Sequence, residues 1–199
     1  MRQSHFRTFR VRRGQTLLEL LTALFVLSLV LVGALALTNS NFRLEGIGSS
    51  RLVATNLARE GVELARSIRD SNWLSSRAFD DGLSDTNHCA VLSAQANQPF
   101  VDHFTFLECK DGFDASFQLY QSADGRYSAD AAFGNLSQIF RNIRLDPICL
   151  DASNVQSIKT DTACDPGTKI GLQVKGEVGW YYAGQKMTVV LTEQIYDWQ

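Results

Sequence analysis

The sequence predicts an α+β protein in which a long N-terminal helix packs on a C-terminal antiparallel β-sheet. Residues 17–37 form an apolar run of membrane-spanning length, and helical periodicity continues to residue 73. Beyond that point the chain changes to short segments in which apolar and polar residues alternate, the pattern of half-buried strands. At 199 residues, the chain is long enough for one globular domain and an extended element.

The composition is that of an ordinary folded protein. Apolar residues make up 45% and charged residues 20% of the chain, which argues against extended disorder. The charges are unevenly placed, because residues 1–13 hold five arginines and no acid. The remainder is net acidic and lacks the clustered Lys and Arg of a nucleic-acid-binding surface. We therefore expect no nucleic-acid partner.

Residues 17–37 are predicted to form a membrane-spanning helix. At about 1.5 Å per residue this run would measure roughly 31 Å, close to the thickness of the hydrocarbon core of a bilayer. All five N-terminal arginines precede it. The positive-inside rule therefore places the N-terminus in the cytoplasm and the residues after Leu37 outside, in a single-pass topology.

Two ordinary export signals compete for this segment. Residues 34–36 (Ala-Leu-Ala) form an acceptable signal-peptidase site, and residues 12–13 (Arg-Arg) fit a twin-arginine signal. Glu19 argues against an ordinary signal peptide, because a carboxylate near the centre of a membrane costs roughly 2.5–3.5 kcal/mol and would bring such a peptide no advantage. Helical periodicity also resumes almost at once after the apolar run, without the cluster of turn residues expected at a signal-peptide junction.

A third interpretation rests on a resemblance. The residues around Gly14 resemble the class III leader of type IV pilins and type II secretion pseudopilins, over the run Arg12-Arg13-Gly14-Gln15-Thr16-Leu17-Leu18-Glu19-Leu20. In that family a membrane aspartic peptidase cuts after the glycine and methylates the new N-terminal amine. The resemblance implies a processing site formed by Arg13, Gly14 and Gln15, with cleavage after Gly14 and methylation of Gln15. The family usually has Phe where this chain has Gln15.

Glu19 corresponds, in this resemblance, to the glutamate five residues into the mature chain. After cleavage, the ammonium of Gln15 would lie at the membrane edge, one helical turn from Glu19. We expect the carboxylate of one subunit to pair with the terminal ammonium of a neighbour, which would fix the axial register of the assembling helices. The alternative is that Glu19 only extends to the membrane interface.

Residues 42–73 are predicted to continue the helix as an amphipathic half. Small and apolar residues recur there at spacings of three and four and form one stripe that a globular head would cover: Val53, Ala54, Leu57, Ala58, Gly61, Leu64, Ala65 and Ile68. Gly33 and the pair Gly46 and Gly48 are candidate kinks or melted turns. We therefore divide the chain into a leader at 1–14, a helical spine at 15–73 and a β-rich head at 74–199.

The clearest pattern in the head is at its end. Apolar residues alternate over 170–180 and again over 187–195, on either side of residues 183–185, which predicts a long antiparallel hairpin with one buried face. Earlier alternations, over 104–106, 113–119 and 139–145, indicate shorter strands. The resemblance to the pilin family is specific over about residues 10–73 and only loose in the head.

All four cysteines lie outside the membrane in this topology. An even number of cysteines in an exported domain indicates disulfides, and four allow three connectivities. We favour Cys89–Cys109 and Cys149–Cys164, because each pair closes a local loop worth roughly 3 kcal/mol in the chain-entropy model.

No metal site or cofactor is predicted. A zinc site from His88, Cys89, His103 and Cys109 would need a C-x-x-C or H-x-x-x-H spacing, which the sequence lacks. Loop carboxylates that would suit calcium are also common turn residues, and the candidates are Asp80, Asp81, Asp85, Asp124 and Asp130.

No enzymatic motif occurs in the sequence. It contains no G-x-S-x-G, P-loop, dinucleotide-binding glycine pattern or H-E-x-x-H.

We interpret the chain as a fibre-forming minor pilin or pseudopilin that is held in the inner membrane until an assembly platform extracts it. Its expected partners are prepilin peptidase, other pilin or pseudopilin subunits, the inner membrane and the assembly platform. The alternative is a monomeric, membrane-anchored or secreted binding domain with an ordinary signal or anchor segment.

Overall fold

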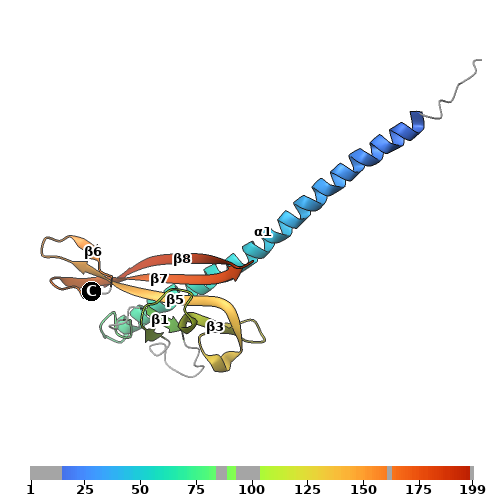
Figure 1. Ribbon diagram of the computed structural model, residues 1–199. Helices are drawn as coiled ribbons and strands as arrows, with labels where there is room; N and C mark the ends of the chain where they lie inside the picture. The colour runs from blue at the N-terminus through green and yellow to red at the C-terminus, as the bar shows by residue number, and fades with distance from the viewer. Residues whose placement is uncertain (1–14, 84–88, 93–103, 161–162, 198–199) are drawn as a thin grey trace, which may run out of the picture. The chain divides into compact units, whose positions relative to one another are not determined.

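The computed structural model describes residues 15–83, 89–92, 104–160 and 163–197. The chain divides into two compact units, residues 1–47 and 48–199, and helix α1 (Gln15–Leu74) contributes to both. In its described part, the first unit consists of the N-terminal portion of α1. The second unit contains the remainder of α1 and an eight-stranded sheet (Figure 1). The α+β fold class predicted from the sequence is therefore confirmed.

Helix α1 continues without interruption over its 60 residues. Gly33, Gly46 and Gly48 all lie within it, so the melted turns expected at these glycines are absent from this part of the described chain. A side chain added at Gly33 or Gly48 would meet nothing within 4 Å. The division between the two units falls at Ile47–Gly48, inside the glycine pair.

Three long strands form the centre of the second unit. β5 (Asn135–Leu150) pairs with β7 (Thr168–Tyr182), which in turn pairs with β8 (Gln185–Tyr196). β5 also pairs with three short strands in succession, two of which hold a further strand each, and all these pairings are antiparallel. The short strands are β1 (Cys89–Leu92), β2 (Phe104–Leu107), β3 (Gln118–Gln121), β4 (Tyr127–Ser128) and β6 (Gln156–Ile158).

The β7–β8 hairpin turns through two residues. Ala183 and Gly184 have φ values of 49° and 78°, as the two central positions of a tight hairpin turn require. Tyr182 on one strand faces Gln185 on the other. The long C-terminal hairpin expected from the alternation around residues 183–185 is therefore present.

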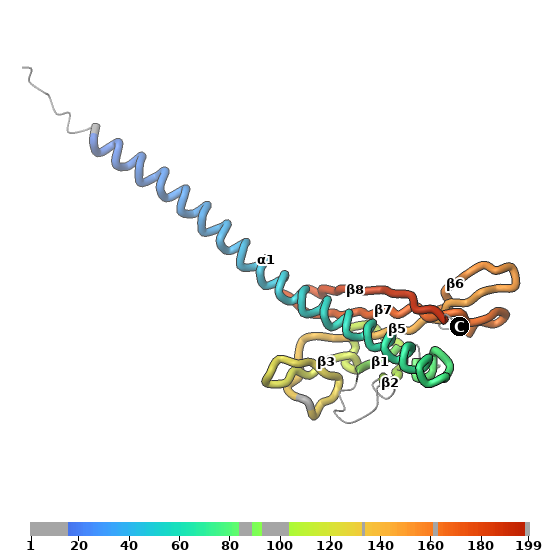
Figure 2. The backbone as a smooth tube through the Cα atoms, turned by 180° about the vertical axis from the view of Figure 1, so that it is seen from behind, coloured from blue at the N-terminus to red at the C-terminus, as the bar shows by residue number. Residues whose placement is uncertain are grey.

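The second-unit portion of α1 packs on one face of the long strands, and Figure 2 shows it lying along β7 and β8. Most of the predicted stripe is buried there, since five of its members are at most 8% exposed: Ala54, Leu57, Ala58, Ala65 and Ile68. They contact inward-facing residues of the sheet such as Val174, Val178 and Ile195. The amphipathic half of the helix thus supplies one wall of the core.

Two glycines allow the helix and the sheet to approach closely. A Cβ at Gly176 of β7 would lie 2.8 Å from the Ala58 carbonyl oxygen of α1. A Cβ at Gly61 of α1 would lie 2.4 Å from Cδ1 of Ile143 on β5. A larger residue at Gly176 meets backbone rather than a flexible side chain, so that position has little room to adapt.

One ion pair joins β5 to α1 at this face. Arg141 is 1% exposed, and its Nη1 donates to Oε2 of Glu60 at 2.6 Å. Burial lowers the pKa of the Arg141 guanidinium, and the Glu60 carboxylate acts in the opposite direction. Arg141 Nε has no hydrogen-bond partner within the described residues. Glu60 is therefore the group that compensates a charge buried in the core.

Replacing Glu60 with Ala is expected to lower the free energy of unfolding by about 2–3 kcal/mol, because it leaves the guanidinium of Arg141 buried and unpaired. A fully buried pair would lose more, but the Glu60 side chain is 57% exposed and water reaches it. The matched control is Glu63→Ala, which breaks an exposed pair with Arg66 and should cost under about 1 kcal/mol. Urea unfolding of the full chain in detergent measures both variants, and equal losses would contradict this role of Glu60.

Candidate functional site: the N-terminal processing and assembly segment

The candidate site lies at the start of α1. Arg13 and Gly14, two of the expected processing residues, lie outside the described residues. Gln15 is the first residue that the structure describes, and it already lies in α1. Glu19 follows one turn later in the same helix.

The apolar residues of this segment lie on all sides of the helix. Their exposed fractions run from 53% at Leu24 to 70% at Leu37, so no described residue of the first unit covers them. A helix that is apolar all round needs a bilayer or other apolar chains around it. By length and composition, α1 is able to cross a membrane.

The hydroxyl groups of the segment are satisfied within the helix. Thr22 donates to the Glu19 carbonyl at 2.9 Å and Ser28 to the Phe25 carbonyl at 2.7 Å. Thr38, just after the apolar run, donates to Ala34 in the same way at 2.9 Å. Because each donor has an internal acceptor, these residues can enter hydrocarbon without an unpaired hydrogen-bonding group.

Glu19 is the one strongly polar side chain in the run 17–37. It is exposed, and its carboxylate makes no hydrogen bond or ion pair with any residue that the structure describes. An ionised carboxylate in an apolar environment requires a cation or hydrogen-bond donors. The partner of Glu19 would therefore come from outside the described chain.

The four cysteines form two disulfides, Cys89–Cys109 and Cys149–Cys164, with sulfur–sulfur distances of 2.01 and 1.91 Å. These are the pairs that the sequence favours. The first joins the start of β1 to the chain just after β2, and the second joins the end of β5 to the segment before β7. Both lie in the second unit, where they constrain the short strands and the connection between β5 and β7.

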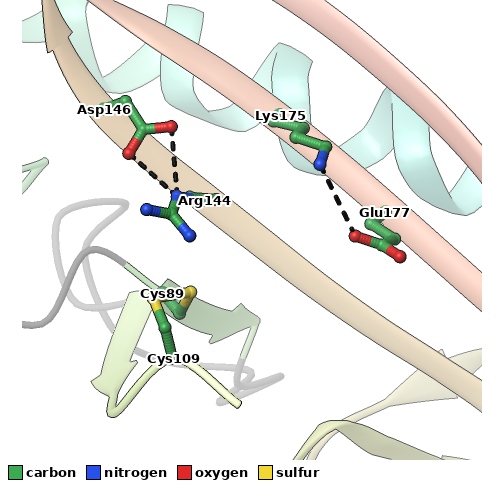
Figure 3. The surroundings of a disulfide bond; sticks show 6 residues. All are labelled: Cys89, Cys109, Arg144, Asp146, Lys175 and Glu177. Atoms are coloured by element: carbon green, nitrogen blue, oxygen red, sulfur yellow. Dashed lines mark hydrogen bonds and ion pairs between the residues drawn. A yellow bond between two sulfur atoms is a disulfide. The ribbon is translucent and has the colours of Figure 1, made fainter. Parts of the chain in front are cut away.

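Charged side chains near the first disulfide neutralise one another. Figure 3 shows Arg144 beside Asp146 on β5 and Lys175 beside Glu177 on β7, with shortest nitrogen–oxygen distances of 2.9 and 3.8 Å. Since side chains alternate along a strand and Ile143 contacts the helix, Arg144 points to the opposite face of the sheet. This face therefore carries paired charges near the first disulfide.

The alternative zinc ligands are not brought together as free groups. Cys89 and Cys109 share a disulfide, so neither can supply a thiolate to a metal ion. His88 and His103 lie outside the described residues.

The candidate calcium ligands have other partners. Asp80 pairs with Lys169, Asp81 with Arg77 and Asp124 with Arg126, while Asp130 accepts from the Ala132 N–H at the start of a 3₁₀ helix. Asp85 lies outside the described residues. No three metal-ligating side chains are grouped together in the described ranges.

Residues 9–35 match the prokaryotic N-terminal methylation motif. This motif is the hallmark of type IV pilin and pseudopilin sequences of the prepilin type, so the resemblance seen around Gly14 is confirmed. The match supports a pilin-like protein that is processed as a prepilin, and it implies a structural subunit rather than an enzyme. No match was found among curated proteins or among solved structures.

The ion pair between Arg141 and Glu60 was not predicted from the sequence. The sequence did contain an indication of this pair. Arg141 lies at a spacing of two from apolar residues on both sides, in the row Ile139, Arg141, Ile143 and Leu145, and the other three residues of that row are apolar. A charged residue at the period of a buried face indicates a buried ion pair. The identity of its partner on α1 required the structure.

Proposed function

We propose that this chain is a structural subunit, a minor pilin or pseudopilin, of a type IV pilus or a type II secretion-like filament. The observation that carries the proposal is the match of residues 9–35 to the N-terminal methylation motif, which runs into α1. The exposed apolar surface of residues 17–37 supports it, because a bundle of like helices would remove that surface from water once the subunit leaves the membrane.

Processing is the first step of this function. Prepilin peptidase cuts the bond between Gly14 and Gln15, with Arg13 on the leader side, and methylates the amine of Gln15. Because Gln15 already lies in α1, the mature chain would be helical from its first residue.

The membrane topology follows from charge and redox chemistry. The five arginines before residue 14 keep the N-terminus in the cytoplasm, and residues 17–37 cross the inner membrane. The remaining chain lies outside, where disulfides persist, and the two disulfides of the second unit support that location.

Assembly uses the membrane-spanning helix a second time. The assembly platform moves the subunit out of the bilayer, and helices of other pilin or pseudopilin subunits replace the lipid. Glu19 of one subunit then pairs with the terminal ammonium of a neighbouring Gln15. An unpaired charge in apolar surroundings costs free energy, so the ion pair favours the one axial register in which both charges meet over the other registers.

Cleavage is tested by co-expressing the full chain with a prepilin peptidase and measuring the mass of the intact chain and of its first peptide. The expected N-terminus is Gln15, with or without one added methyl group. Gly14→Val is the control, and we expect it to remain uncut because a branched side chain occupies the position of a glycine. A terminus at Leu37, or an untouched Met1 in both proteins, would contradict the proposal and favour a monomeric anchored or secreted binding domain.

The register role of Glu19 is tested by Glu19→Ala in cells that carry the assembly machinery. Cleavage and export should be retained, while the ratio of sheared filament to membrane-bound subunit should fall about tenfold, because the ammonium of a neighbour loses its partner, at a cost of roughly 1–3 kcal/mol. The matched control is Thr22→Ala, which removes a hydroxyl bonded only to its own helix. Equal incorporation of the Glu19 variant and the control would exclude the register role.

A further inference from the structure

The portion of α1 in the second unit has a face that the sheet does not cover. The residues of this face follow one another at spacings of three and four, so they lie along one side of the helix. The first five are exposed and the last two are half-buried. We call this face the outer stripe, and it consists of Gly48, Leu52, Asn56, Arg59, Glu63, Arg66 and Asp70.

Arg59 is a charge of the outer stripe that lacks a counterion. The residue is exposed, and its guanidinium makes no ion pair with any residue that the structure describes. Glu63 lies one turn further along the helix but pairs with Arg66, at 2.6 Å. Within one helix, a cation placed four residues before an acid is the less favourable of the two orders. The guanidinium of Arg59 is therefore available to a carboxylate of another chain.

Negative charge is in excess around Arg66. Its guanidinium donates to Glu63 and also to Glu193 of β8, so one cation serves two carboxylates. The Glu63 side chain is 52% exposed, which leaves its carboxylate accessible to a second cation. Asp70, whose side chain is 49% exposed, pairs with Arg69. The outer stripe thus carries an unpaired cation one turn before an excess of negative charge.

The charges of the outer stripe alternate in sign, in the order Arg59, Glu63, Arg66 and Asp70. Two parallel copies in the same register, or displaced by seven residues, would bring like charges together, which is unfavourable. A displacement of four residues, about 6 Å at 1.5 Å per residue, instead places Arg59 of one copy beside Glu63 of the other. The same displacement places Arg66 beside Asp70. The charge pattern therefore favours one displacement between neighbouring copies.

The apolar part of the outer stripe fits the same displacement. Leu52 is 65% exposed, and a Cβ added at Gly48, four residues earlier, would meet nothing within 4 Å. Two copies displaced by four residues bring Leu52 of one beside Gly48 of the other. The missing side chain of the glycine leaves room for the leucine and allows the two helices to approach closely. This contact removes the apolar surface of Leu52 from water.

We propose that the outer stripes of neighbouring copies pack side by side, parallel and displaced by four residues, so that Arg59 of one copy pairs with Glu63 of the next. The contact joins different residues of the two copies, so it is heterologous and repeats along a filament. Exposed ion pairs add little affinity. Their effect here is to select the displacement, as interhelical ion pairs do in coiled coils.

The same displacement occurs in the register proposed for the N-terminal segment, because four residues also separate Gln15 from Glu19. The copies are parallel because each one enters the filament from the same membrane. The inference therefore rests on the proposed function and adds to it a specific contact between subunits.

Cysteine cross-linking measures the displacement. Two forms of the full chain, Arg59→Cys and Glu63→Cys, carry tags of different mass and are co-expressed with prepilin peptidase and the assembly machinery. The native cysteines are all in disulfides. Mild oxidation of sheared filaments should give the mixed dimer at least fivefold over either homodimer, because facing positions of helices about 8–10 Å apart come within disulfide range. A statistical mixture of the three dimers, or filaments without a cross-link, would overturn the contact.

Charge reversal tests whether the ion pair selects this contact. Arg59→Glu sets two carboxylates against each other at every interface and should lower the ratio of sheared filament to membrane-bound subunit about fivefold. Adding Glu63→Arg restores opposite charges in the exchanged order and should recover at least half of the original ratio. The control is Arg51→Glu, the same change of charge at an exposed residue of α1 outside the outer stripe. Equal losses in Arg59→Glu and the control, or no recovery in the double variant, would contradict the proposal.

Two further measurements on the same samples separate the possible causes of a failure. Protease resistance of the second unit checks that each variant is folded. The N-terminus is determined as well: filaments cleaved at Gln15 that lack the mixed dimer refute this contact alone, whereas an uncut chain refutes the proposed function.

Discussion

Apolar surface on the first portion of α1 is the constraint on which the rest of this account depends. Each exposed Leu, Val or Phe of residues 17–37 would gain roughly 1.5–3 kcal/mol from full burial, and the described chain buries none of them. The segment therefore needs a bilayer or a bundle of similar helices. The second-unit portion of the same helix differs, because the sheet of its own chain covers its apolar stripe. The apolar surface of α1 is thus covered by its own chain in the second unit, whereas in the first portion it needs lipid or other helices.

The second unit is organised around that covered stripe. Gly61 and Gly176 let the helix and the sheet approach closely, and Glu60 from the helix neutralises the buried Arg141. The disulfides constrain the short strands and the β5–β7 connection.

Patterns local in the sequence were predictable, and contacts between distant residues were not. The spacing of apolar residues within a single segment predicts three features: the apolar run at 17–37, the stripe from Val53 to Ile68 and the β7–β8 hairpin. The alternation over 113–119 was misleading, because Asp114 caps a 3₁₀ helix over Ala115–Phe117 and the strand begins only at Gln118. β1 escaped prediction because all four of its residues are buried, so it shows no alternation. The ion pair between Arg141 and Glu60 joins β5 to α1, and neither segment reveals it alone.

The most direct test of the central claim is whether the first portions of α1 pack against one another in the assembled state. A nitroxide label at Val26→Cys reports this by pulsed electron paramagnetic resonance, since the native cysteines are paired and do not react. Helices in contact lie about 8–10 Å apart, so the account predicts short distances between labels on separate copies in sheared filaments. A featureless background in that fraction, identical to the signal of the membrane-bound monomer, would contradict it.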